Sequence, residues 1–220
     1  MLDAFLGSAE KLPQRTDNSS RTSGRLLFAL DATASRQPSW DQACHLQSEM
    51  FQATNKLGGL ELQLCYYQGF HQFHTSPWLR DSNTLQNIMN NVRCLGGHTQ
   101  LLRVLDHSLQ QHHQQAIQAV VIIGDAIEEP IDTLCEKAGQ LGMQGVPLFL
   151  FQEGDNPMVK NGFQQMAILS HGAYAAFDQH SAQQLGQMLA AVATFASGGL
   201  NALQQLQSAA AKQLLTQLKA

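Results

Sequence analysis

The chain has 220 residues, of which 44% are hydrophobic, so it is long and apolar enough to bury one substantial core. Its formal net charge of -4 comes with only 13 lysines and arginines and no basic run, which excludes the usual electrostatic pattern of a nucleic-acid binder. The chain does not open with a basic segment and a long apolar core, and no apolar stretch approaches the roughly 20 residues of a membrane helix. We therefore expect neither a nucleic-acid nor a membrane partner.

The cysteine pattern indicates a reducing compartment. The four cysteines are widely spaced, form no C-x-x-C pair and each lie within an apolar pattern; they are Cys44, Cys65, Cys94 and Cys135. Free cysteines of this kind behave as small core residues, whereas disulfides are largely confined to oxidising compartments. The pattern predicts reduced thiols in a cytoplasmic protein.

Three parts of the chain differ in composition. Residues 1–24 begin with a short apolar run and continue as a cluster of Ser, Thr, Asn and Gly, which is typical of a flexible leader. Residues 25–197 alternate between apolar runs and helix-period segments and are expected to form the domain. Residues 198–220 follow with leucines at near-helical spacing after a Gly-Gly pair, which predicts one C-terminal amphipathic helix. Its apolar face either packs on the core or mediates docking and self-association.

The predicted elements follow from these runs in chain order. Strands are expected at residues 25–31, 60–69, 70–78, 119–125, 146–151 and 173–178. Helices are expected at residues 38–57, 82–92, 99–113, 131–144, 156–172 and 181–196.

The composition of these strands predicts how the sheet is built. Most are apolar throughout and separated by helices, as in a mostly parallel sheet that is covered on both faces. Residues 70–78 differ, because polar and aromatic residues alternate and Pro77 cannot donate to a central ladder, so we expect an antiparallel edge strand there. The predicted fold class is α/β, with a Rossmann-like open, mostly parallel sheet sandwiched by helices.

Oxygen-bearing side chains follow the strands at the edge where such sheets bind ligands. Asp31 ends the first strand and is followed at alternate positions by Thr33 and Ser35, whose side chains can face one ion if the turn is extended. Asp125 follows the fourth core strand, and Thr99 stands at a helix start. Two carboxylates and three hydroxyls suit Mg²⁺, with Mn²⁺ or Ca²⁺ as alternatives. The opposing interpretation is that these residues only cap helices.

Several neighbouring residues allow two interpretations. Glu128 and Glu129 either support the metal ligands as hydrogen-bond acceptors or begin the following helix, whose dipole favours acidic residues there. His98 borders the predicted site and either contacts a ligand or is an ordinary loop side chain. His71 and His74 are not expected to bind zinc, because on a strand their side chains point to opposite faces.

The three sequence segments together resemble the von Willebrand factor A (VWA) family. Its metal-ion-dependent adhesion site combines Asp-x-Ser-x-Ser after the first strand, a Thr in a later loop and an Asp after the fourth strand. This chain has Asp-Ala-Thr-Ala-Ser at residues 31–35, Gly-Gly-His-Thr at 96–99 and Ile-Ile-Gly-Asp at 122–125. The resemblance covers residues 25–197. It departs from the family pattern where Thr33 replaces the usual Ser and where Ala126 replaces the Gly that often follows the last Asp.

The resemblance implies a metal-dependent protein-binding domain, such as an adaptor or co-chaperone of the bacterial, intracellular type. An Asp or Glu of a partner protein would complete the coordination of the cation, and a ring ATPase system is one partner of this kind. Charge supports this, because two carboxylates balance a divalent ion and leave it able to take one more anion. The resemblance therefore implies a binding module and no enzymatic activity.

An enzyme is the competing hypothesis. A haloacid dehalogenase-like phosphatase also places a nucleophilic Asp after the first strand of an α/β sheet and uses Mg²⁺, which would make Asp31 the nucleophile. The hallmark of that class is a second Asp two residues on, and Thr33 occupies this position. A dinucleotide-binding site is not expected, because no G-x-G-x-x-G follows a strand.

Overall fold

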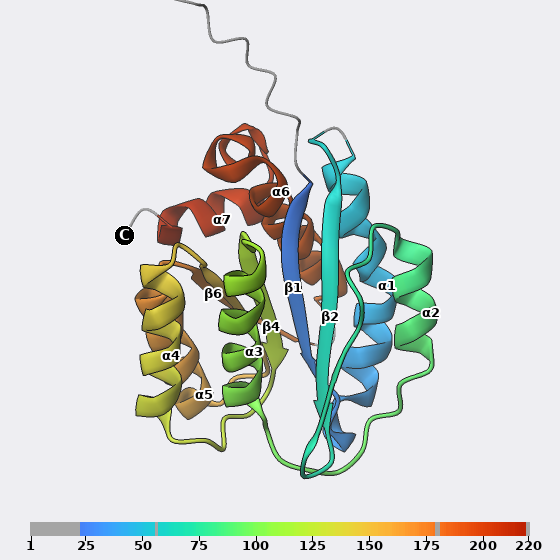
Figure 1. The fold of residues 1–220 in the computed structure, drawn as a ribbon, viewed down its shortest axis with the longest axis vertical. Helices are drawn as coiled ribbons and strands as arrows, with labels where there is room; N and C mark the ends of the chain where they lie inside the picture. Colours follow the sequence, from blue (N-terminus) through green and yellow to red (C-terminus); the bar gives the residue numbers. More distant parts are fainter. Residues whose placement is uncertain (1–22, 56, 179–180, 219–220) are drawn as a thin grey trace, which may run out of the picture.

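A computed structural model describes residues 23–55, 57–178 and 181–218 (Figure 1). The strands are β1 (Gly24–Asp31), β2 (Leu60–Gln68), β3 (Gln72–Thr75), β4 (Ala119–Gly124), β5 (Leu148–Glu153) and β6 (Ala173–Phe177). The helices are the short 3-10 helix η1 (Ala34–Arg36), α1 (Gln37–Thr54), α2 (Ser82–Asn90), α3 (Leu101–Gln114), α4 (Ile131–Met143), α5 (Pro157–Leu169), α6 (Ala182–Gln205) and α7 (Ala209–Leu218). The expected leader lies almost wholly outside the described residues.

The strands form one sheet in the order β3-β2-β1-β4-β5-β6. All neighbouring strands are parallel except β2 and β3, whose pairing is antiparallel. This confirms the predicted α/β class with a mostly parallel sheet and one antiparallel edge strand. The connection from β1 to β2 runs through α1 on one face, and that from β4 to β5 through α4 on the other, as Figure 1 shows.

Two apolar cores cover the two faces of the sheet. Leu26, Phe28 and Leu30 of β1 face the core formed with α1, α2, α6 and α7. Leu27 and Ala29 of the same strand face the core formed with α3, α4 and α5. Because side chains alternate along a strand, a strand covered on both faces must be apolar at every position, which explains the uninterrupted run in the sequence.

The C-terminal region corrects the prediction of a single helix over residues 198–220. Helix α6 continues past the domain end expected at residue 197 and reaches Gln205, with a kink at Gly199, whose φ of 69° glycine adopts easily. Helix α6 ends at Gln205, and a second helix, α7, begins at Ala209. Ala211 and Leu214 of α7 are fully buried in the core on the α1 side. The described part of this region therefore packs on the sheet, as the core alternative expected.

All four cysteines are free thiols. Cys44 and Cys65 are buried, and Cys94 and Cys135 are half-buried. Burial raises the pKa of the Cys44 thiol to about 12, and nearby Asp41 and Cys94 add to the shift. Burial likewise raises the pKa of Cys65. Protonated thiols are weak nucleophiles, so these two cysteines act as core residues.

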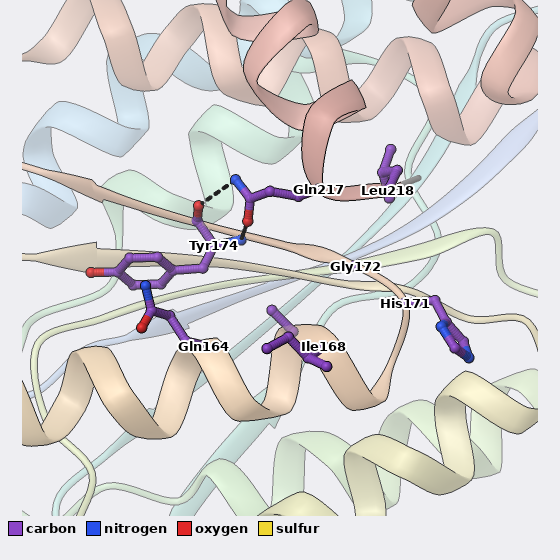
Figure 2. A pocket seen from close by; sticks show the side chains of 8 residues that line it. Gln164, Ile168, His171, Gly172, Tyr174, Gln217 and Leu218 are labelled. Carbon is purple, nitrogen blue, oxygen red and sulfur yellow. Dashed lines mark hydrogen bonds between the residues drawn. The ribbon is translucent and has the colours of Figure 1, made fainter. Parts of the chain in front are cut away.

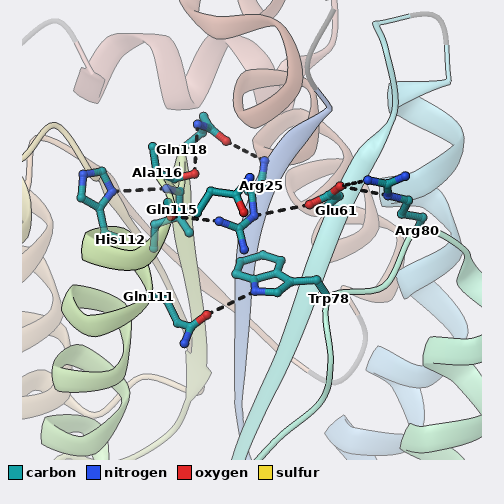
Figure 3. A network of polar contacts seen from close by, with 10 residues as sticks. Arg25, Glu61, Trp78, Arg80, Gln111, His112, Gln115, Ala116 and Gln118 are labelled. Atoms are coloured by element: carbon teal, nitrogen blue, oxygen red, sulfur yellow. Dashed lines mark hydrogen bonds and ion pairs between the residues drawn. The ribbon is translucent and has the colours of Figure 1, made fainter.

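A polar network at the amino edge of the sheet ties β1 to its neighbours (Figure 3). The Arg25 side chain is only 7% exposed, and its Nε lies 3.4 Å from Oε2 of Glu61 on β2. Its guanidinium also lies 3.7 Å from the centre of the Trp78 ring and donates to the Gln115 carbonyl at 2.9 Å. Burial lowers the pKa of Arg25, and the charge of Glu61 opposes that shift. The ion pair therefore stabilises a charge that the sheet has largely removed from water.

We predict that Glu61→Gln lowers the free energy of unfolding by about 2 kcal/mol, because it leaves the buried Arg25 guanidinium without a carboxylate. Arg80 also contacts Glu61, but its side chain is 78% exposed. The matched Arg80→Gln change is therefore expected to cost about 0.5 kcal/mol or less. Urea denaturation of the three proteins measures both values. Equal losses in the two variants would show that the buried half of the network is not the stabilising half.

Candidate metal centre

A cavity of about 240 Å³ opens at the carboxyl edge of the sheet. Three separate segments line it: the end of β1 with η1, the loop before α3 and the loop after β4. The lining residues are Asp31, Thr33, Ala34, Ser35, Gly96, Gly97, Thr99, Asp125, Ala126 and Glu128. All five side chains expected from the sequence to bind a metal thus lie around one cavity, whereas their role as ligands stays a prediction.

The segment after β1 is shaped by a local hydrogen bond. Asp31 is 2% exposed, and its Oδ1 accepts from the backbone N–H of Thr33 at 2.7 Å. Thr33 has an extended backbone with φ -74° and ψ 163°, and η1 begins directly after it. The hydroxyl oxygens of Thr33 and Ser35 are 3.5 Å apart. The alternate spacing in the sequence therefore brings both hydroxyls to the same side as Asp31.

The pairing of β1 with β4 brings the second carboxylate into place. Leu30 is paired with Ile123, so both strands end side by side at this edge. The hydroxyl of Ser35 donates to Oδ2 of Asp125 at 3.3 Å, although the two residues are 90 positions apart in the chain. Asp31 and Asp125 therefore flank the hydroxyl groups from two neighbouring strands.

Glu128 and Glu129 hold Thr99 and the start of α3. Glu128 Oε2 accepts from the backbone N–H of Thr99 at 2.8 Å, and Glu129 Oε1 accepts from that of Leu102 at 3.2 Å. The Leu102 N–H is one of the donors that the first turn of a helix leaves unpaired, and the Thr99 N–H lies just before that turn. Of the two alternatives for these residues, support of a predicted ligand is the one observed. The sequence suggested that these glutamates begin the helix that follows them, α4. In the structure they bind the start of α3 instead, which the sequence did not predict.

The oxygens present fit a hard divalent cation. The Thr99 hydroxyl donates to Glu129 Oε2 at 2.5 Å and accepts from the backbone N–H of Glu128 at 3.0 Å, which leaves one lone pair free for a cation. Within the described residues, no group of three or more His, Cys, Asp or Glu side chains is arranged to hold a metal. A cation at this cavity would therefore depend on hydroxyl oxygens beside two carboxylates, a donor set that suits Mg²⁺ and not a soft metal.

The loop that carries Thr99 is fixed against the turn between β2 and β3. The backbone N–H of His98 donates to the Gly69 carbonyl at 3.2 Å. A Cβ atom at Gly97 would lie 1.9 Å from the same carbonyl oxygen, so only glycine allows this approach. The Gly96-Gly97 pair is visible in the sequence, but the contact of Gly97 with Gly69, on another turn of the chain, could not be predicted.

His98 lies at the rim of the cavity. Its Nδ1 is 3.0 Å from Oε2 of Glu128, and its ring contacts the ring of Phe70 edge-on with centroids 5.2 Å apart. Phe70 is 64% exposed on the β2–β3 turn. An aromatic side chain therefore stands in solvent beside the cavity, on the same turn that fixes the Thr99 loop.

Solved structures with the same arrangement were found by comparison. The VWA domain of Catenulispora acidiphila superposes with a TM-score of 0.64 at 13% identity, covering 79% of this chain and 43% of that one. The SpRpn10 VWA domain gives 0.59 at 12% identity, with coverages of 81% and 98%. BatB from Bacteroides thetaiotaomicron gives 0.58 at 15% identity, with coverages of 74% and 96%. The chain has a VWA-like fold.

Another similar structure is the mussel byssus protein PTMP1 with a zinc-occupied MIDAS motif, at a TM-score of 0.61 and 11% identity, covering 76% of this chain and 45% of that one. This chain thus spans less than half of the mussel and Catenulispora chains. No protein-family model and no curated protein matches the sequence.

A neighbour from Bacteroides fragilis is described as an aerotolerance-related membrane protein. Among the helices described here, none has the length and apolar character needed to cross a membrane.

We predict that Gly97→Ala lowers the free energy of unfolding by about 2 kcal/mol or more, because its Cβ would overlap the backbone carbonyl of Gly69. The adjacent Gly96 is the control, since a Cβ there meets nothing within 4 Å. Gly96→Ala is expected to leave stability unchanged or to raise it by up to about 1 kcal/mol. Urea denaturation of both variants measures the difference. If they unfold alike, the loop is not fixed by this contact.

Proposed function

We propose that this VWA-like domain is a metal-dependent protein-binding module. In this proposal Asp31, Thr33, Ser35, Thr99 and Asp125 hold a divalent cation, and an Asp or Glu of a partner protein completes its coordination. The observation that carries the proposal is that five oxygen-bearing side chains from three separate segments line one cavity at the carboxyl edge of the sheet. Ligands of open α/β sheets bind at this edge.

The charges at the cavity support a carboxylate partner. Asp31 and Asp125 contribute two negative charges, which balance a divalent cation, and the hydroxyls contribute none. A bound cation would supply an electrostatic attraction for one further anion. One oxygen of Glu128 and both oxygens of Glu129 bind the Thr99 loop and the start of α3. In this proposal the remaining position is taken by a side chain from another protein.

The accessibility of the cavity is consistent with this role. Ser35 is exposed, whereas Asp31 is buried at the base of the site. A partner carboxylate can therefore approach from the Ser35 side without displacing β1. The mussel protein with a zinc-occupied MIDAS motif gives an instance of a cation bound in this fold. Mg²⁺ is the proposed ion here, with Mn²⁺ and Ca²⁺ as alternatives, and a ring ATPase system is one proposed partner.

We expect the full chain to capture a partner from lysate of its native host only when the cation is present. The immobilised parent protein is compared in Mg²⁺ and in EDTA, together with Asp31→Asn in Mg²⁺. Asp31→Asn keeps the oxygen that accepts from Thr33 and removes the charge. Retention of the partner should fall at least about tenfold in EDTA and in the variant, since breaking a buried charge contact costs about 2–5 kcal/mol.

Asp155→Asn provides the matched control, because Asp155 is an exposed carboxylate in the loop after β5 that does not line the cavity. This variant is expected to retain the partner as the parent does. If all four samples retain the same proteins in the same amounts, binding uses another surface and the proposed function is wrong.

A further inference from the structure

A second cavity, of about 570 Å³, lies between α5, β6 and α7 (Figure 2). Its walls include Gln164, Ile168, His171, Tyr174, Gln217 and Leu218, and none of the described residues that line it is Asp, Glu, Lys or Arg. We call it the α5–β6–α7 groove. Gly172, which also lines the groove, immediately precedes β6, so the groove reaches the amino edge of the sheet, opposite the candidate metal centre. The two sites are therefore separate.

Exposed apolar side chains surround this groove. Ile168 lines it and is 73% exposed. A smaller cavity of about 230 Å³ shares His171 and Leu218 with it and continues to Leu200, another exposed apolar residue. Leu169 is exposed beside Ile168 at the end of α5. Exposed apolar side chains gathered around a cavity in this way are typical of an interaction surface.

The edge of β6 at this groove is already paired. β6 is the last strand of the sheet, and the backbone of Tyr174 bonds to the side-chain amide of Gln217 from α7, as Figure 2 shows. The N–H of Tyr174 donates to Gln217 Oε1 at 2.8 Å, and Gln217 Nε2 donates to the Tyr174 carbonyl at 3.0 Å. An added strand would have to break both bonds. The groove is therefore suited to apolar side chains of a helix and not to an extended peptide.

The first residues of the same chain have the matching sequence pattern. Apolar residues recur at the spacing of one helix face, with polar residues between them, and they are Leu2, Phe5, Leu6, Ala9 and Leu12. This segment is followed by a polar stretch that leads into β1. The sequence thus contains an amphipathic segment whose apolar face carries no charged residue, as binding to an apolar groove requires.

The path from β1 to the groove is short. Parallel strands start at the same edge, and β1 and β6 are three strand steps apart, which is about 14 Å. Residues 13–22 can span up to about 33 Å when extended, which covers this distance with length to spare. Gly24 also packs against α6, where a Cβ would meet the Ala196 carbonyl at 2.4 Å. The preceding residue of α6, Phe195, lines the smaller cavity beside the groove.

We propose that residues 2–12 dock in the α5–β6–α7 groove of the same chain through Leu2, Phe5 and Leu6. The polar stretch that follows acts as a tether, which makes docking intramolecular and gives the segment a high effective concentration at the groove. Docking covers the exposed side chains of Ile168 and Leu200. The segment also competes with any other apolar ligand for this surface.

Hydrogen–deuterium exchange of the full chain tests the proposal. Amides of residues 2–12 are expected to exchange at least about tenfold more slowly in the parent than in Phe5→Asp or Ile168→Asp, because docking protects them. Met158→Asp is the control, since Met158 is also a strongly exposed apolar residue on the same helix but lies outside the groove. It is expected to keep the protection. Unchanged exchange in β1 and β4 verifies that each variant is folded.

Two results would overturn the proposal. In the first, residues 2–12 of the parent exchange as fast as in Phe5→Asp and Ile168→Asp, so the segment does not dock. In the second, protection rises with protein concentration together with a dimer mass, so that the occupant comes from a second copy. Protection that is independent of concentration and lost in both Phe5→Asp and Ile168→Asp supports intramolecular docking.

Discussion

Parallel pairing of β1 with β4 is the constraint that creates the candidate site, because it ends both strands at one edge of the sheet. Asp31 closes β1, and Asp125 follows β4 by one residue, so the two carboxylates meet although they are far apart in the chain. The hydrogen bond from Ser35 to Asp125 joins the two segments directly. A shift of the pairing register by one residue would separate the two carboxylates. It would also move the apolar side chains of one strand from the core on one face of the sheet to the core on the other face.

The acidic residues at this edge have two different functions in the structure. Asp31 and Asp125 line the cavity beside hydroxyl groups, whereas Glu128 and Glu129 bind backbone donors at the start of α3 and the hydroxyl of Thr99. The second pair therefore positions Thr99 relative to the first pair. In the proposed metal site the oxygens would be in place before a cation binds, which would lower the ordering cost of binding.

Local patterns in the sequence were sufficient for much of this structure. Uninterrupted apolar strands predicted the parallel sheet, and the alternation of Asp31, Thr33 and Ser35 predicted side chains on one side of a turn. Contacts between distant residues could not be predicted, such as Gly97 against Gly69 or Gln217 against the β6 backbone. The Gly198-Gly199 pair suggested that a helix ends there, but α6 continues through it with a kink and ends only at Gln205. Where α6 ends and α7 begins depends on how α7 packs on the core, which the local sequence does not show.

Isothermal titration of Mg²⁺ into the full chain tests most directly whether this cavity binds a cation. The account predicts one binding site in the parent and in Asp155→Asn. In Asp31→Asn the affinity should fall by about a hundredfold, as expected for the loss of roughly 2.7 kcal/mol of charge interaction. Equal affinity in all three proteins, or binding of Mg²⁺ in none of them, would contradict the account.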